Sequence, residues 1–213
     1  MIEPREATEN SERFVQVEEF KFDKDLHFQD FGGQPFYPFD PMRSLGCITI
    51  GRLAFVLSSM NRFRGRTKRF YSVAEHSLWV SSLLPSNLEL AGLIHDAHEA
   101  YSPFGDVCGP FKPAFIEDME GEIDVAIAAK FQINVESFWH PDVHKADQIM
   151  LAQERWWLLD ESSPQVNWDC VAEIPRDRKF ESLTIPRSAE DVRISYETKL
   201  RTLLKRQRQS SGR

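Results

Sequence analysis

The chain of 213 residues has only three cysteines, Cys47, Cys108 and Cys170, and they lie far apart in the sequence. They form no CxxC pair, so they indicate neither a disulfide framework nor a cysteine-rich zinc site. No stretch approaches the roughly 20 apolar residues that a membrane-spanning helix needs. The acidic N-terminus lacks the basic start and apolar run of a signal peptide. The sequence therefore predicts a cytoplasmic protein without membrane contact.

Positive charge is also scarce, because 26 Lys and Arg face 33 Asp and Glu, which gives a formal net charge of −7. Proteins that bind nucleic acid usually carry a basic face, so we expect no stable nucleic-acid binding. Apolar residues make up 41% of the chain and supply one sizeable core. We expect a single domain over residues 19–205, with a flexible polar arm at 1–18 and a polar tail at 206–213.

Helical periodicity dominates the chain after about residue 47, and strand patterns are weak. The sequence therefore predicts an all-α fold. Ser72 and Glu75 have the spacing of a capping box, which predicts that the second helix starts at Ser72. The aromatic segment 20–41 contains two glycines and three prolines, so we expect irregular structure or a short hairpin there. Residues 162–188 are expected to form loops, and a small hairpin is the alternative for this segment. The expected helices lie within 48–63, 72–84, 87–101, 114–131, 141–160 and 189–208.

The sequence HDAHE at 95–99 places two histidines and two carboxylates inside an otherwise apolar stretch. Burying such groups without partners is costly. On a continuous helix His95, Asp96 and Glu99 would border one side and converge. His76 and Asp147 also occupy inward positions of their expected helices. A lone inward histidine is more often a hydrogen-bonded core residue, but the joint occurrence of these groups favours a metal site.

The order His76, His95-Asp96, Asp147 reproduces the H…HD…D pattern of the HD-domain metal-dependent phosphohydrolases. The flanking sequences extend the similarity. The chain resembles most the branch that contains bacterial and bacteriophage 5'-deoxynucleotidases, over about residues 38–160. The stretches that carry this resemblance are RF at 62–63, FYSVAEHS at 70–77, LAGLIHDAHEAY at 90–101, GD at 105–106 and GPFK at 109–112.

The resemblance implies an HD-domain helical bundle that hydrolyses phosphate from deoxynucleotides and assembles as a homo-oligomer. It implies one divalent ion, with Mn²⁺, Co²⁺, Fe²⁺ or Ni²⁺ favoured over Zn²⁺ or Mg²⁺. Glu99 and Asp106 match family acids that orient the attacking water or protonate the leaving oxygen. Two more residues separate the HD pair from Gly-Asp here than in the family pattern. The implied metal ligands are His76, His95, Asp96 and Asp147.

The loop at 62–69 is basic within an acidic protein and leads directly to the helix of His76. Arginine presents a planar fork that suits phosphate oxygens, so we expect this loop to contact the substrate phosphate. The expected phosphate-binding residues are Arg62, Arg66, Arg69 and Lys112. The number of cations suits a triphosphate better than a monophosphate. Both dNMPs and dNTPs such as dATP therefore remain open as substrates.

Further polar residues leave other functions open. His98 and His144 could belong to a second metal, as in an HD-scaffold di-iron oxygenase, although His98 is also expected as an outward hydrogen-bond donor. A non-catalytic, metal-stabilised nucleotide-binding module is the other alternative. Glu154 lies two turns after Asp147 on the same face, so we expect it to orient Asp147 or a ligand histidine.

Overall fold

The computed structural model describes residues 23–159, 168, 171 and 173–211, and these residues form an all-α fold with one small hairpin, as predicted. The predicted arm at 1–18 lies outside the described residues. The hairpin lies in the aromatic segment, where β1 (Phe28–Gln29) pairs antiparallel with β2 (Pro35–Phe36). Where residues 162–188 are described, they form a 3-10 helix and turns rather than a second hairpin.

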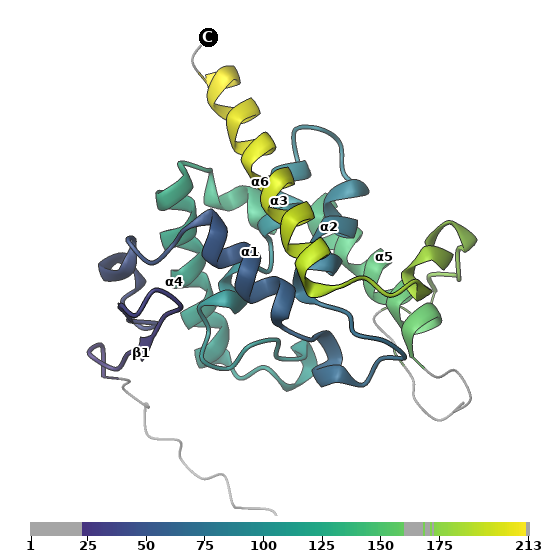
Figure 1. Ribbon diagram of the computed structural model, residues 1–213, viewed down its shortest axis with the longest axis horizontal. Coiled ribbons are helices and arrows are strands. Elements are labelled where there is room, and N and C mark those ends of the chain that lie inside the picture. Colours follow the sequence, from purple (N-terminus) through teal and green to yellow (C-terminus); the bar gives the residue numbers. More distant parts are fainter. Residues whose placement is uncertain (1–22, 160–167, 169–170, 172, 212–213) are drawn as a thin grey trace, which may run out of the picture.

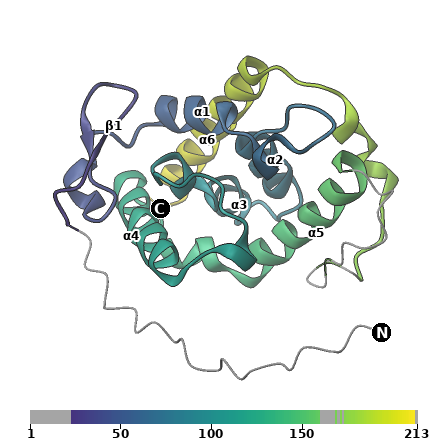
Figure 2. The same ribbon diagram turned by 90° about the horizontal axis from the view of Figure 1, so that it is seen from below.

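Six α-helices and several short 3-10 helices are described, and α3 lies at the centre with α2, α4 and α5 around it (Figure 2). The α-helices are α1 (Ile50–Ser59), α2 (Val73–Ser82), α3 (Glu89–Ile94), α4 (Ala114–Phe131), α5 (Pro141–Leu158) and α6 (Ala189–Ser211). The 3-10 helices are η1 (Pro41–Ser44), η2 (Arg62–Gly65), η3 (Ala97–Ala100), η4 (Gly109–Phe111), η5 (Val135–Trp139) and η7 (Arg178–Thr184). No described helix combines the length and hydropathy that crossing a bilayer requires.

The start of α2 confirms the predicted cap. The Ser72 hydroxyl accepts a hydrogen bond from the backbone N–H of Glu75 at 3.2 Å, which satisfies one of the free amides at the helix start. The side chain of Glu75 is buried and pairs with Arg69 instead of returning to the Ser72 backbone. The cap fixes where α2 begins, and therefore the position of His76 one turn later.

The expected continuous helix at 87–101 is wrong, because α3 ends at Ile94. Asp96 has φ −100° and ψ 17°, and a separate 3-10 helix begins at Ala97. Two side chains satisfy carbonyls at the end of α3, which otherwise lack intrahelical partners. His95 Nδ1 lies 3.0 Å from the Gly92 carbonyl, and the Tyr196 hydroxyl donates to the Leu93 carbonyl at 3.0 Å. The break therefore falls directly at the His-Asp pair.

Gly92 allows α3 to lie close against α2. A Cβ atom at this position would lie 2.3 Å from Cδ1 of Leu84 and 3.3 Å from Cα of Ser81, so a larger residue would push the helices apart. This close approach brings the end of α3, with His95, toward the middle of α2, with His76.

Two apolar clusters form the core. The larger cluster joins residues from α1, α3, α4 and α6, including Leu53, Ile94, Ile123 and Tyr196. The smaller cluster joins α5, η7 and one end of α2, including Met150. Because α2 contributes Val73 to the first cluster and Val80 to the second, its middle, with His76, is anchored on both sides.

The last helix lies beside α1, and its final turns extend beyond the other helices in this view (Figure 1). The predicted polar tail at 206–213 is therefore helical through residue 211. Arg206 Nη1 pairs with Glu89 Oε2 of α3 at 2.7 Å, so this part of α6 also contacts the body of the protein.

Candidate metal centre

Four polar side chains from α2, α5 and the turn after α3 converge on one point. His76 Nε2 lies 3.3 Å from His95 Nε2 and 3.0 Å from Asp147 Oδ1. His95 Nε2 lies 3.8 Å from Asp147 Oδ1 and 3.2 Å from Asp96 Oδ1, and Asp96 Oδ2 lies 3.6 Å from His76 Nε2. The structure thus brings together all four residues that the resemblance implies as metal ligands.

The two histidines turn the same nitrogen toward this point. His76 Nδ1 contacts Oε1 of the buried Glu154 at 2.5 Å, and His95 Nδ1 contacts the Gly92 carbonyl at 3.0 Å. A carboxylate and a carbonyl only accept, so Nδ1 carries a proton in both rings, and in the neutral form of each ring Nε2 keeps its lone pair. This arrangement is typical of histidines that bind metals. Glu154 was expected to orient Asp147 or a ligand histidine, and the structure shows that it contacts the histidine His76.

The donor atoms fit a divalent cation. Ligands at about 2.1 Å from an ion and at right angles lie about 3 Å apart, close to the shorter separations observed here. Two imidazole nitrogens and two carboxylates form a mixed N/O donor set that suits transition metals. His76, His95, Asp96 and Asp147 could therefore hold one such ion.

The four groups strongly influence each other's protonation. Burial lowers the pKa of His95, but Asp96 and Asp147 outweigh it and hold that pKa well above its ordinary value. Burial raises the pKa of Asp147, but hydrogen bonds with His76 and His95 hold it well below its ordinary value. The pKa of Asp96 is lowered in the same way by His95. The carboxylates that attract a proton to His95 also attract a metal ion to its Nε2 atom.

Arg62 contacts this centre from the loop after α1. Its guanidinium is buried and lies 3.3 Å from both Asp96 Oδ2 and Glu154 Oε2. Burial lowers its pKa, but Glu154 and Asp96 outweigh this and keep it above the ordinary value. Phe63 and Arg64 follow with positive φ angles of 53° and 51°, which are strained for residues with side chains. This tight turn directs Arg62 inward.

The two predicted catalytic acids lie near the centre. Asp106 Oδ2 accepts a hydrogen bond from the Phe63 backbone N–H at 3.2 Å. Glu99 is 5% exposed, and its Oε2 atom is buried without a hydrogen-bond partner among the described residues. Burial, and then the charges of Asp96 and Asp106, hold the pKa of Glu99 well above its ordinary value. Glu99 thus has the perturbed environment typical of a proton-transferring group.

The predicted phosphate-binding residues have different surroundings. Arg69 donates two hydrogen bonds to the buried Glu75 carboxylate, at 2.9 and 2.8 Å, and further hydrogen bonds to backbone carbonyls. Its guanidinium therefore stabilises the fold. Arg66 is exposed. Lys112 Nζ lies 2.6 Å from Oε2 of Glu120. Of the four predicted residues, the structure brings Arg62 into contact with the metal-centre side chains.

Sequence reasoning missed the polar residues of α4 that face His98. Glu120 and Asp124 of α4 are buried, with 5% and 3% of their surface exposed. His98 Nδ1 lies 3.1 Å from Asp124 Oδ1, so the expected outward position of His98 is wrong. Glu120 and Asp124 are four residues apart and lie beside Ile123 and Ile127 on the helix surface, a spacing that could have indicated a buried polar strip. His144, the other candidate for a second metal, is exposed.

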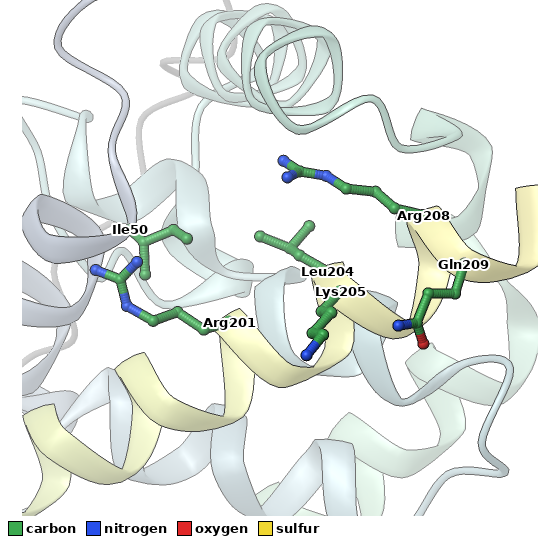
Figure 3. A pocket seen from close by; sticks show the side chains of 6 residues that line it. All are labelled: Ile50, Arg201, Leu204, Lys205, Arg208 and Gln209. Carbon is green, nitrogen blue, oxygen red and sulfur yellow. The ribbon is translucent and has the colours of Figure 1, made fainter. Parts of the chain in front are cut away.

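A separate groove of about 370 Å³ lies between the start of α1 and the end of α6. It contains none of the candidate metal ligands or acids, so it is distinct from the candidate metal centre. Its lining residues, shown in Figure 3, are Ile50, Arg201, Leu204, Lys205, Arg208 and Gln209.

No family model matches the chain. The chain is similar to a protein of Escherichia coli (strain K12) described as "Uncharacterized protein YfdR", with 36% identity over 153 residues. The aligned region covers 70% of this chain and 81% of that protein.

Proposed function

The chain belongs to the family of the Escherichia coli protein YfdR, and we propose that it is a divalent-metal-dependent phosphohydrolase that acts on deoxynucleotides. The observation that carries this proposal is the convergence of His76, His95, Asp96 and Asp147, with both Nε2 atoms turned toward the two carboxylates. The order of these residues in the sequence resembles the HD-domain phosphohydrolases. We propose a cytoplasmic HD-domain enzyme that forms homo-oligomers.

The four ligands would hold one divalent ion, with Mn²⁺, Co²⁺, Fe²⁺ or Ni²⁺ favoured by the donor set. When bound, such an ion neutralises charge on the phosphoryl group and lowers the pKa of water. Glu154 and the Gly92 carbonyl fix the ring orientations of His76 and His95, so the donor atoms are positioned before any ion binds.

The remaining residues have separate roles in this proposal. Arg62 places a permanent positive charge at the edge of the centre, where it attracts the substrate phosphate. The exposed Arg66 lies in the same loop and adds charge for the distal phosphates of a longer substrate. Glu99 and Asp106 orient the attacking water or protonate the leaving oxygen. Arg69 and Lys112 are assigned no direct phosphate contact, because each is paired with a glutamate.

A substrate screen tests the proposal. The full chain loaded with Mn²⁺ or Co²⁺ would be incubated with all dNMPs and dNTPs, and the products resolved into phosphate and triphosphate. Release of phosphate from a dNMP assigns a nucleotidase, and release of triphosphate from a dNTP assigns a triphosphohydrolase. The Asp147→Ala variant is the matched control for contaminating activity. If no nucleotide is hydrolysed with either metal, the enzyme proposal fails and a nucleotide-binding module is favoured.

A further inference from the structure

His98 is held in the same way as His76. Its Nδ1 atom lies 3.1 Å from Asp124 Oδ1, just as His76 Nδ1 contacts Glu154. The acceptor carboxylate again places the proton on Nδ1 in the neutral ring. His98 Nε2 faces another carboxylate, with 3.6 Å to Oε2 of Glu120. A histidine whose Nδ1 is fixed by a carboxylate and whose Nε2 faces acidic oxygens has the second-sphere support of a metal ligand.

Acidic oxygen atoms without partners lie beside it. Asp96, His98 and Glu99 each offer one ligand atom, and these three atoms lie within 4.8 Å of one another. Glu99 Oε2 and Glu120 Oε1 are buried and have no hydrogen-bond partner in the described part of the chain. Leaving a buried polar atom unpaired costs about 1 to 3 kcal/mol. Solvent does not reach these oxygens, so there is little room beside them. A small ion would therefore fit between them better than a bulky organic group.

Carboxylate side chains also outnumber lysine and arginine side chains around His98. Glu120 and Asp124 contact its ring, and Glu99 and Asp96 lie one and two residues from it in the chain. Of the residues that the structure describes, Lys112 and Arg62 are the lysine and arginine that pair with these four acids, and Lys112 pairs with Glu120. Arg62 pairs with Asp96 but is shared with Glu154, so it neutralises this group only in part. In the neutral forms that metal binding requires, His95 and His98 add no positive charge, so this buried group then has an excess of negative charge that favours a cation.

We propose that His98 and Glu99, together with Asp96, form a second divalent-cation site in which Asp96 is shared with the centre of His76, His95 and Asp147. Glu120 lies at the edge of this site and Asp124 supports His98. A cavity of about 410 Å³ gives a path for an ion to enter. Its lining includes His98, Lys112, Glu120, Asp124 and Trp139.

The second ion changes the role of Glu99 in the proposed function, and this consequence alone rests on that function. A Glu99 that ligates a cation stays ionised, so it orients the attacking water rather than protonating the leaving oxygen. Two ions that share one carboxylate are suited to holding the attacking and leaving oxygens of a phosphoryl transfer.

Metal stoichiometry tests the site without any substrate. The full chain, stripped with EDTA, would be equilibrated by dialysis with saturating Mn²⁺ and its bound metal measured by elemental analysis. We expect two ions per wild-type chain and one fewer in His98→Ala. In electron paramagnetic resonance, the wild type is expected to give the spectrum of a coupled Mn²⁺ pair, and the variant that of an isolated ion. His144→Ala, which removes an exposed histidine before Asp147, is the matched control and should keep the wild-type number.

Asp124→Asn is a milder second variant, because it keeps a hydrogen-bond acceptor for His98 Nδ1 and removes the charge. It is expected to weaken the affinity for one of the two ions by about 10- to 100-fold and to leave the other unchanged. Equal metal content in wild type and His98→Ala, or a single class of bound ion whose affinity Asp124→Asn does not change, would overturn the proposal and leave His98 as an imidazolium between Asp124 and Glu120. Absence of nucleotide hydrolysis would contradict the proposed function, but it would not change these metal counts.

Discussion

His76 and Glu154 share a buried contact between Nδ1 and Oε1, and this contact determines which nitrogen of His76 faces the other candidate ligands. The Tyr71 hydroxyl donates to the same oxygen at 2.8 Å and holds the carboxylate in place. We expect Glu154→Gln to weaken Mn²⁺ binding at the first centre by about 10- to 100-fold, because the amide is a poorer acceptor from the imidazole. Isothermal titration calorimetry measures this change.

Glu181→Gln, at an exposed position of η7, is the control for the loss of one acidic charge. It should bind Mn²⁺ as the wild type does. Equal affinities of Glu154→Gln and the wild type would show that Glu154 does not support His76 as a ligand.

Two substitutions distinguish the proposed roles of Asp96 and Glu99. Asp96→Ala removes the carboxylate that contacts both histidines, so metal at the first centre and turnover should be lost together. Glu99→Gln should keep the ion held by His76 and Asp147 and lower turnover by about 100- to 10,000-fold, the range of general acid–base catalysis. Metal analysis and steady-state kinetics on the same samples check both results. Full activity in Glu99→Gln would exclude the role assigned to it.

Arg66 and Arg69 lie three residues apart in one loop and are expected to respond differently. Arg69→Ala leaves the buried Glu75 carboxylate without its ion pair, which should lower the free energy of unfolding by about 3 to 5 kcal/mol. Arg66→Ala should leave stability unchanged and raise the KM for nucleotides. Urea unfolding and kinetics distinguish these outcomes. If Arg69→Ala is as stable as Arg66→Ala, the pair with Glu75 contributes little to the fold.

The metal-free protein should lose stability as the pH rises above neutrality. Asp124 outweighs burial and raises the pKa of His98 from 6.5 to about 9, and the pKa of His95 is raised in the same direction. A raised histidine pKa contributes stability that is complete below the unfolded-state value and is lost as the pH passes the folded-state value. We expect a loss of up to about 3 kcal/mol for His98 between pH 6.5 and 9, measured by chemical unfolding in EDTA.

Saturating Mn²⁺ should reduce or reverse this trend, because metal binding needs the neutral rings and strengthens with pH. A metal-free stability that rises from pH 6.5 to 9 would contradict the protonated histidines inferred from the structure.

The residues of the candidate metal centre could be predicted because each one breaks a pattern. His76 and Asp147 interrupt helical faces that are otherwise apolar, and Ser72 marks the start of α2. Their distance in space could not be derived from the sequence, because it depends on how α2 packs against α3 at Gly92. The meeting of their side chains therefore follows from helix packing and from the resemblance to a known family, and not from helical periodicity.

The shape of the HDAHE segment could not be predicted from periodicity. Helical spacing continues through residue 101, but the bonds from His95 and Tyr196 to the carbonyls of α3 end the helix at Ile94. The inward face of α4 was missed for a similar reason. Glu120 and Asp124 look like solvent-exposed acids until His98, more than twenty residues earlier, is placed against them.

The hydrogen bond from Tyr196 to the Leu93 carbonyl links the end of the chain to the residue just before Ile94 and His95. No predicted ligand lies beyond Asp147, so the first 160 residues look sufficient for metal binding. A truncated chain that ends before α6 would nevertheless lose the partner of that carbonyl and the apolar cover that Tyr196 and Leu200 provide. The candidate metal centre would thus form only after synthesis reaches α6, and shorter translation products should not bind metal there even though they contain every candidate ligand.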